Sequence, residues 1–487
     1  MFSNDEEEID GEFVDNLLSR INSGIAGYVD PDDIKDSYFF LVNEGRRSDA
    51  DALLNWGLQR QPDNVKLLLV RVTQHIDNDE REQAKHLLNY LSETAQDSPS
   101  FHFDLAILAL RDGDLPNAMK GFEKSFSLAT DDEVNLFIMD AAADLCRCEY
   151  YEEALTFYAR LTPNDIFSDA QLAFEYAYAL DKSNRDDEAI RAYEEVVKLD
   201  PFCANAWNNL GIEYGKKDRL AESLEAYISS SDANPYNQSP YFNKGNTLKA
   251  LERYYEAIES YTEYVSLVAL YSVEKTLDDV DSVVFMHIGE CWQALGNYEM
   301  AKRFLCLTVN VYQPDSDNAW FRLGRCLVEK GENNAGRQAF EMAISIYGEC
   351  PEYYYSNAQA HLNLGDVSGC IRMLEFGLSK SPNDVLAWFE VIRMKLMNMN
   401  VGAARSVSDY IAEMKHKYNS PTALRLVEAY IDYFVYGKKR AATTKLRMVA
   451  GETPGVICEA SIEPMLSKLF EQKEVVPILK EFNIRLQ

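Results

Sequence analysis

The sequence has no long apolar run and no basic amino terminus. The uncharged stretch YVSLVALYSV at residues 264–273 is only ten residues long, whereas a membrane-spanning helix needs about 20 apolar residues. The opening stretch MFSNDEEEIDGEFVD contains seven acids and no base, whereas a secretory signal begins with basic residues and continues into an apolar segment. These absences predict a cytoplasmic protein that does not insert into a membrane.

Positive charge is scarce. The 487 residues include 48 Lys and Arg against 79 Asp and Glu, for a formal net charge of −31. Nucleic acids and anionic membrane surfaces both bind clustered bases. The composition therefore argues against a nucleic-acid partner and is compatible with basic or neutral protein partners.

Histidine, cysteine and the common catalytic motifs are also poorly represented. None of the six His has a partner at metal-ligand spacing, and the nine Cys are scattered singly apart from Cys146 and Cys148. Two residues at that separation point to different sides of a helix, so we expect no zinc site. In a long chain without an export signal, we expect the thiols to be reduced. The motifs GxxxxGK[ST], GxGxxG, HExxH and GxSxG are absent. We therefore expect no metal, no cofactor and no catalytic residues, and the chain is not predicted to be an enzyme.

What the sequence does contain is a recurring pattern of aromatic, small and proline residues. The stretch AWNNLGIEYGKKDRLAESLEAYISSSDANPY begins at Ala206. It resembles the tetratricopeptide repeat, whose 34-residue unit reads W-x2-L-G-x2-Y, then A-x3-F, then P. The matching residues are Trp207, Leu210, Gly211, Tyr214, Tyr227 and Pro235, and only the alanine is replaced, by Ser223. Small residues at positions 8 and 20 of the unit would let its two helices approach closely.

The same register extends through most of the chain. Position 8 falls on Val72, Ala106, Ala142, Ala177, Gly211, Gly245, Gly289, Gly324 and Ala358, with gaps of 34 to 36 residues except for one of 44. The resemblance therefore implies an all-α, right-handed α-solenoid of about ten to eleven tetratricopeptide-like helix pairs at residues 34–450. Residues 1–33 are predicted to be an acidic disordered segment and residues 451–487 a C-terminal helical cap. The extra residues in the long gap favour lengthened helices or an added loop over a special binding element.

In this family the first helix of each pair lines a concave groove, with positions 2, 6, 9 and 13 facing inward. Position 6 along the array is an acidic row followed by amides and then bases, namely Asp104, Asp140, Glu175, Asn209, Asn243, His287 and Arg322. Asn246 and Arg325 both fall at position 9 of their repeats. The acids would attract a basic segment and the amides would bind a peptide backbone. The alternative interpretation is a polar face that is simply solvated.

The resemblance implies a non-catalytic scaffold or adaptor that binds a partner protein segment, extended or helical and possibly basic, in its concave groove. The best-formed repeats, at residues 173–340, are the expected place for this surface. A constitutive structural subunit of a larger complex is the alternative, and a regulatory subunit of an enzyme or an RNA-binding helical-repeat protein is a more remote one. The basic run KKRAATTKLR at Lys438–Arg447 could dock the acidic N-terminal tail of another copy or an anionic partner, but a solvated helix face is the simpler interpretation.

Overall fold

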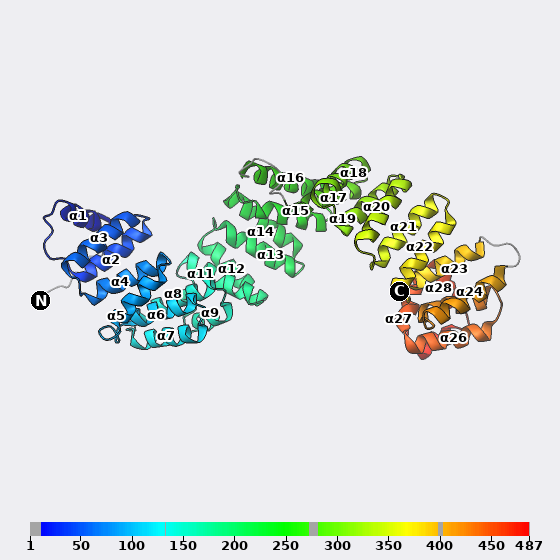
Figure 1. The fold of residues 1–487 in the computed structure, drawn as a ribbon. Coiled ribbons are helices and arrows are strands. Elements are labelled where there is room, and N and C mark those ends of the chain that lie inside the picture. Colours follow the sequence, from blue (N-terminus) through cyan, green and yellow to red (C-terminus); the bar gives the residue numbers. More distant parts are fainter. Residues whose placement is uncertain (1–10, 132, 272–280, 398–402, 487) are drawn as a thin grey trace. The chain divides into compact units, whose positions relative to one another are not determined.

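The computed structural model describes residues 11–131, 133–271, 281–397 and 403–486, and these residues form helices with no β-strand. They divide into two compact units, Met1–Pro235 and Tyr236–Gln487. Within each unit, consecutive helices pack as antiparallel pairs and each pair packs on the next one (Figure 1). The predicted fold class, an all-α solenoid of tetratricopeptide-like pairs, is confirmed.

The first unit contains six helix pairs in the described residues. They are α2 (Pro31–Asn43) with α3 (Arg47–Arg60), α4 (Val65–Asp77) with α5 (Arg81–Leu91), α6 (Pro99–Arg111) with α7 (Leu115–Leu128), α8 (Val134–Arg147) with α9 (Tyr151–Tyr158), α11 (Ala170–Lys182) with α12 (Asp186–Leu199), and α13 (Ala204–Lys216) with α14 (Leu220–Ala233). The short helix α10 (Pro163–Ile166) lies between the fourth and fifth pairs.

The second unit contains a further six pairs in its described part. They are α15 (Ser239–Ala250) with α16 (Tyr254–Tyr271), α17 (Val283–Ala294) with α18 (Tyr298–Leu307), α19 (Asp317–Glu329) with α20 (Asn333–Ile346), α21 (Pro351–Asn363) with α22 (Val367–Lys380), α23 (Val385–Met397) with α24 (Ala403–Lys417), and α25 (Thr422–Phe434) with α26 (Lys439–Glu452). A π-helical turn, η1 (Thr308–Tyr312), extends α18. The two units thus hold one pair more than the upper predicted number.

Glycine at position 8 lets the two helices of a pair come into contact. A Cβ atom added to Gly245 would lie 2.5 Å from Cε1 of Tyr261, and one added to Gly324 would lie 2.6 Å from Cε1 of Phe340. Real Cβ atoms do not approach other atoms this closely, and both rings are buried. The small residue in the sequence pattern is therefore required by an aromatic ring of the second helix.

The tryptophan at position 4 is bonded to the turn that precedes its own repeat. Trp207 Nε1 donates a hydrogen bond to the carbonyl of Pro201 at 2.9 Å, and Trp320 does the same to Pro314 at 2.7 Å. Trp388 repeats the contact with Pro382 at 2.7 Å. The recurring spacing of six residues between proline and tryptophan thus joins the end of one repeat to the first helix of the next.

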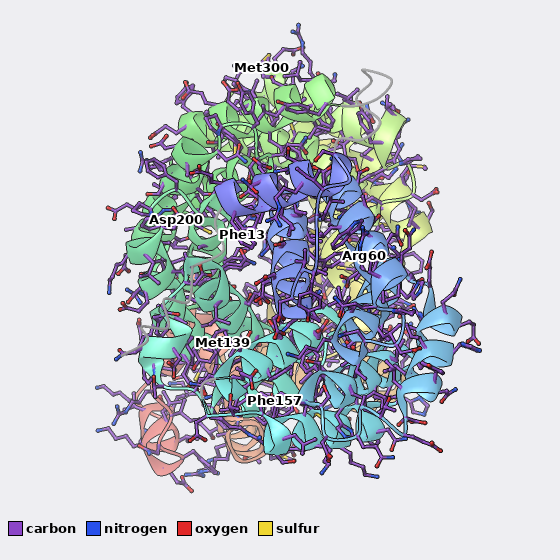
Figure 2. The ribbon with its side chains drawn as sticks, turned by 90° about the vertical axis from the view of Figure 1, so that its left-hand side faces the viewer. Phe13, Arg60, Met139, Phe157, Asp200 and Met300 are labelled. Atoms are coloured by element: carbon purple, nitrogen blue, oxygen red, sulfur yellow. The ribbon has the colours of Figure 1, made fainter. Side chains whose placement is uncertain are left out.

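The amino-terminal region contains a helix that the sequence analysis did not predict. Residues 1–10 lie outside the described part, but α1 (Gly11–Asn22) is helical and buries Val14 and Leu17 against α2 and α3. Phe13 packs on the same cluster (Figure 2), and Asp15 pairs with Arg46 at 2.8 Å. The expected disorder is therefore wrong for Gly11–Asn22, because this acidic stretch still has an apolar stripe at helical spacing.

The long gap between repeats corresponds in part to a longer helix. Helix α16 has 18 residues, whereas most second helices have 14 or fewer, and the remaining extra residues, 272–280, lie outside the described part of the chain. At the other end, α27 (Pro454–Ser461), α28 (Pro464–Phe470) and α29 (Val476–Glu481) share one apolar core with α25 and α26. These three short helices cover the last repeat where a further pair would otherwise pack.

Candidate functional site

A cavity of about 450 Å³ opens on the first helices of the amino-terminal repeats, α2, α4, α6 and α8. Its lining residues are Lys35, Phe39, Thr73, Ile76, Asp77, Ser100, Phe103, Asp104, Ile107, Arg111, Glu133, Leu136, Phe137, Asp140, Asp144 and Arg147. In α6 and α8 they include residues at positions 2, 6 and 13 of the repeat, which the resemblance implied would face inward. We call this site the N-terminal cavity.

One wall of the N-terminal cavity is apolar. Phe103 of α6 and Phe137 of α8 pack ring to ring, with centroids 5.4 Å apart, and Ile107 lies buried beside them in the cavity lining. Leu136, by contrast, is 62% exposed. A large apolar side chain that lines a concavity and remains open to water is a feature of surfaces that bind a partner.

Asp104 lies in the cavity lining and is only 5% exposed. Its Oδ1 accepts a hydrogen bond from Thr73 Oγ1 at 3.3 Å, while its Oδ2 has no partner within the described residues. Burial raises the pKa of this carboxyl well above its ordinary value. A buried oxygen without a partner is costly, so this group is either protonated or balanced by something that enters the cavity.

Three further carboxyl groups surround Asp104. Asp77 and Asp140 remain accessible to solvent, yet desolvation by the surrounding walls raises the pKa of both. Burial raises the pKa of Asp144 to about 6, although Arg147 Nη2 lies 2.7 Å from its Oδ1. The positive charge present in the cavity is therefore not sufficient to keep these carboxyls at their ordinary pKa.

The predicted acidic row divides between the cavity and its edge. Asp104 and Asp140 lie in the N-terminal cavity, whereas Glu175 does not line it. Glu175 lies on α11, where it accepts a hydrogen bond from Gln171 at 2.9 Å, and its charge contributes to the raised pKa of Asp140. The charge of Glu175 therefore acts on the neighbouring member of the row, although only Asp104 and Asp140 line the cavity.

Two of the three predicted amides are hydrogen-bonded to tyrosines of the second helix in their own or the preceding pair. Asn209 Nδ2 donates to Tyr193 Oη at 3.1 Å, and Asn246 Oδ1 accepts from Tyr261 Oη at 2.7 Å. Asn243 lies on α15 with Asn246. A peptide backbone would have to share or replace these bonds, and the role of the three amides as peptide contacts stays a prediction.

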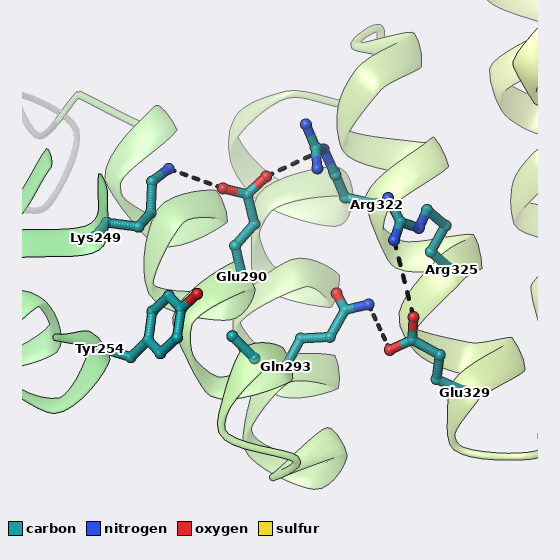
Figure 3. Close-up of a pocket in the computed structure, with 8 residues that line it drawn as sticks. Lys249, Tyr254, Glu290, Gln293, Arg322, Arg325 and Glu329 are labelled. Atoms are coloured by element: carbon teal, nitrogen blue, oxygen red, sulfur yellow. Dashed lines mark hydrogen bonds and ion pairs between the residues drawn. The ribbon is translucent and has the colours of Figure 1, made fainter. Parts of the chain in front are cut away.

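In the second unit, the predicted bases lie in a smaller cavity of about 320 Å³ formed by α15, α17 and α19, which we call the C-terminal cavity (Figure 3). Glu290 lies between two of its bases, 2.9 Å from Lys249 Nζ and 3.0 Å from Arg322 Nε. Arg325 faces Glu329 at 4.0 Å, and Gln293 donates to the same glutamate at 2.7 Å. The bases of this cavity are therefore compensated by acids of the chain itself.

His287 belongs to the aromatic packing next to the C-terminal cavity. Its ring centroid lies 6.1 Å from that of Phe242 and 5.7 Å from that of Tyr261. Burial, aided by the nearby charge of Lys249, lowers the pKa of His287 to about 4. The imidazole is therefore neutral at physiological pH, and its role as a partner contact stays a prediction.

The described residues include no cluster of three His, Cys, Asp or Glu side chains that could hold a metal ion. The nine cysteines are free thiols, and burial raises the pKa of Cys146 to about 12, which makes it a poor nucleophile. No helix in the described ranges has the length and apolarity to cross a bilayer.

The basic run at Lys438–Arg447 is largely occupied by ion pairs within the second unit. Lys439 lies 2.9 Å from Glu474, Lys445 bridges Glu428 and Asp432, and Arg447 lies 3.4 Å from Glu481. These contacts join α26 to the neighbouring helices and to the C-terminal helices. Three of the five bases are thus paired within the chain rather than simply solvated, and docking of an anionic partner by this run stays a prediction.

The part of the N-terminal cavity that belongs to the weakest repeats was not predicted from the sequence. Thr73 and Asp77 of α4 line the cavity, and they occupy positions 9 and 13 of the repeat in which position 8 is Val72. Lys35 and Phe39 come from α2, which carries no clear signature. Extending the inward positions into the α4 repeat would have found Thr73 and Asp77.

Comparisons with known proteins find the tetratricopeptide-repeat family at residues 174–238 and 239–267. The peroxisomal targeting signal receptors of Eremothecium gossypii and Kluyveromyces lactis are 25% and 24% identical to this chain over 202 and 205 residues. The matched region is 37% of this chain and only about a third of either receptor, 35% and 36%.

Similar solved structures include YrrB, described as a TPR protein with an unusual peptide-binding site, at 16% identity and a TM-score of 0.34. That match covers 40% of this chain and 95% of YrrB. The anaphase-promoting complex hetero-tetramer Cut9–Hcn1 matches at 13% identity and a TM-score of 0.36, over 85% of this chain and 91% of the other.

Proposed function

We propose that this chain, whose residues 174–238 and 239–267 match tetratricopeptide-repeat models, is a non-catalytic adaptor that holds a segment of a partner protein against its first helices. The observation that carries the proposal is the N-terminal cavity, in which an apolar wall stands beside carboxyl groups that the chain leaves incompletely compensated. Sites of this kind orient a ligand through a few polar groups and bind it through apolar contact.

The energetics of the apolar wall fit a short protein segment. A large apolar side chain that becomes fully buried contributes about 1.5–3 kcal/mol, and the wall formed by Phe103, Phe137 and Leu136 has room for one or two such side chains. Ordering the segment costs about 0.5–1.5 kcal/mol for each immobilised side chain. Apolar contact alone would therefore give weak binding, and the polar groups must add affinity and orientation.

The curated relatives support the class of activity. They are named as receptors for a peroxisomal targeting signal, which is a recognition function for a segment of another protein. Since the match covers about a third of their length, the proposal takes from them only this class of function and not the identity of the bound signal.

The proposal is tested by reversing the accessible acids of the row. The double variant Asp140→Lys, Glu175→Lys, used as bait in affinity purification with quantitative mass spectrometry, should lose at least tenfold of the partner recovered by the wild-type chain. Asp104 is left unchanged because a lysine at its buried position would destabilise the repeat. The matched control is Glu225→Lys, Asp232→Lys, which makes the same charge change at exposed positions of the second helix α14.

Equal partner recovery by the groove variant and the wild type would contradict the proposal. An outcome in which the wild-type chain is soluble only with a partner, and the groove variant keeps that partner, would instead favour a constitutive structural subunit. Such a subunit would be held through surfaces other than the first helices.

A further inference from the structure

We propose that the N-terminal cavity accepts the side chain of a lysine or arginine that is adjacent to a large apolar residue in the partner segment. This inference rests on the proposed function, because it names the chemistry of the segment that the adaptor holds. It is carried by the charge balance of the cavity, by the buried unpartnered oxygen of Asp104 and by the position of the apolar wall.

The cavity has an excess of acids over bases. Five carboxyl groups and three basic groups line it. The bases are Lys35 from α2, Arg111 from α6 and Arg147 from α8. The acids are Asp77 from α4, Asp104 from α6, Glu133 immediately before α8, and Asp140 and Asp144 from α8. A cation from outside would reduce this imbalance, whereas an anion would increase it.

Two of the bases already have partners. Arg147 pairs with Asp144 at 2.7 Å, and Arg111 donates to the carbonyl of Ile76 and lies 4.0 Å from Asp77. The ion pairs of the described cavity thus include Asp77 and Asp144, but neither Asp104 nor Asp140. Glu133 is also outside these ion pairs, but it accepts hydrogen bonds from Thr130 N and Oγ1 at 3.2 and 2.7 Å and lies in the field of Lys35. The least compensated acids are therefore Asp104, which is buried, and Asp140, which is accessible, at position 6 in neighbouring repeats.

Asp104 provides a second observation that points to a ligand. Asp104 is only 5% exposed, lines the cavity and leaves Oδ2 without a partner among the described residues. An ammonium or guanidinium group bound at the accessible Asp140 would bring positive charge close to this oxygen, in an environment of low dielectric where charge interactions are strong. The cation would make its direct contacts with Asp140 and act on Asp104 through the field.

The apolar wall fixes the neighbour of the basic residue. Phe137 and Leu136 precede Asp140 by about one turn of α8, and Phe103 directly precedes Asp104 on α6. A segment with its cation at Asp140 therefore places an adjacent side chain over these three residues. An apolar neighbour would bury the exposed surface of Leu136, whereas a charged neighbour would lose hydration there.

The same geometry makes the binding dependent on pH. Desolvation raises the pKa of Asp77, Asp104 and Asp140, and that of Asp144 to about 6. A bound cation favours the ionised form of each carboxyl, so binding releases protons and strengthens as pH rises. The other charged groups that face these carboxyls are Lys35 of α2, Arg47 of α3, Arg111 of α6, Glu133 before α8, Arg147 of α8 and Glu175 of α11.

The test uses random dodecapeptides displayed on phage and selected against the full-length chain. We expect selected peptides to be enriched in Lys or Arg next to Phe, Leu, Ile or Met. Selection against the variant Asp140→Asn, Asp144→Asn should lose the basic preference and keep the apolar one. The best peptide, made synthetically, is then titrated calorimetrically beside a copy in which norleucine replaces the basic residue.

For the wild-type chain, the norleucine copy should bind at least tenfold more weakly, and for the Asn variant the two peptides should bind within about twofold of each other. The affinity of the basic peptide should rise severalfold between pH 5.5 and pH 7.5, with proton release seen as a dependence of the enthalpy on the buffer. Because this comparison uses two peptides on one protein, it does not depend on the stability of any variant.

Two failures are distinguishable. Peptides that bind through the cavity, shown by loss of binding in Leu136→Glu, but that carry no basic preference would overturn this inference and leave the proposed function standing. Selected peptides whose binding is unaffected by Leu136→Glu, or a selection that yields no binder, would overturn both.

Discussion

Two glycines one helical turn apart should respond in opposite directions to the same substitution. Gly211 and Gly215 both lie in α13. A Cβ atom at Gly211 would lie 2.7, 2.8 and 3.0 Å from Cε1, Cδ1 and Cζ of Tyr227, whose side chain is 5% exposed and cannot move away into solvent. A Cβ atom at Gly215 would have Ser223 Oγ at 3.6 Å as its nearest neighbour, which is an ordinary contact.

The magnitudes follow from two competing effects. Alanine is favoured over glycine inside a helix by about 1 kcal/mol, and this gain is smaller, about 0.5 kcal/mol, near a helix end that frays. Gly215→Ala should therefore stabilise the repeat by about 0.5–1 kcal/mol. Gly211→Ala has the same propensity gain but overpacks a buried ring, at a cost of about 1–3 kcal/mol. Its net effect is a destabilisation of about 1 kcal/mol.

The measurement must be local, because a long repeat array need not unfold in one step. Hydrogen–deuterium exchange with mass spectrometry, read on peptides from α13 and α14, supplies this. A change of 1.4 kcal/mol in opening free energy is a tenfold change in an equilibrium constant, so Gly211→Ala should speed exchange about fivefold and Gly215→Ala should slow it. Slower exchange in Gly211→Ala, or equal exchange in both variants, would refute the role assigned to position 8.

Three further predictions concern other parts of the chain. Leu17→Ala should destabilise the packing of α1 by about 2–5 kcal/mol and speed tryptic cleavage after the exposed Arg20 at least tenfold. The control Asn16→Ala, at an exposed position, should leave the cleavage rate unchanged. Equal cleavage rates in the two variants would mean that α1 is not packed on the repeats. Lys445→Met should destabilise the C-terminal repeats by about 2–3 kcal/mol, since Asp432 is buried and loses its partner, while Lys439→Met should leave the melting temperature unchanged because its pair with Glu474 is exposed. The folded-state pKa of Asp144 lies above its ordinary value, at about 6, so its contribution to stability is greatest below about pH 4 and declines as pH rises through 6. The free energy of unfolding of the wild type, relative to that of Asp144→Asn, should therefore fall by about 1–3 kcal/mol from pH 4 to pH 7. A pH-independent difference would contradict the burial of this carboxyl.

The sequence predicted the repeat architecture because each residue of the signature makes a contact at a fixed spacing within or between neighbouring repeats. Gly245 with Tyr261 and Trp207 with Pro201 are two such contacts. The helix α1 was not predicted, since it is a single 12-residue amphipathic helix in an acidic stretch and has no repeat to align with. Its stability comes from packing on α2 and α3, which composition does not reveal.

The sequence predicted which face of the helices carries the candidate site, but not how deeply each of its residues is buried. The repeat register indicates that position 6 faces inward, and Asp104 and Asp140 both lie in the N-terminal cavity. The register is the same for the two residues, yet Asp104 is buried and Asp140 is accessible. This difference depends on the preceding repeat, where Thr73 of α4 contacts Asp104, and it cannot be obtained from one repeat considered alone.

The contrast between the two cavities explains why the sign of a charge in the sequence is a poor guide to what it binds. Arg322 was predicted as a contact for a partner segment, but Glu290, three residues after His287 on α17, lies 3.0 Å from its Nε and also pairs with Lys249. A ligand would have to separate these pairs before it could use the bases, and this cost offsets the attraction. Asp104 and Asp140 impose no such cost, because the ion pairs of their cavity leave them out. Under the proposal, the groups open to a partner are therefore the acids of the first unit, and selectivity for a basic segment would follow from the two carboxyls that the ion pairs of the described cavity leave out rather than from the overall net charge.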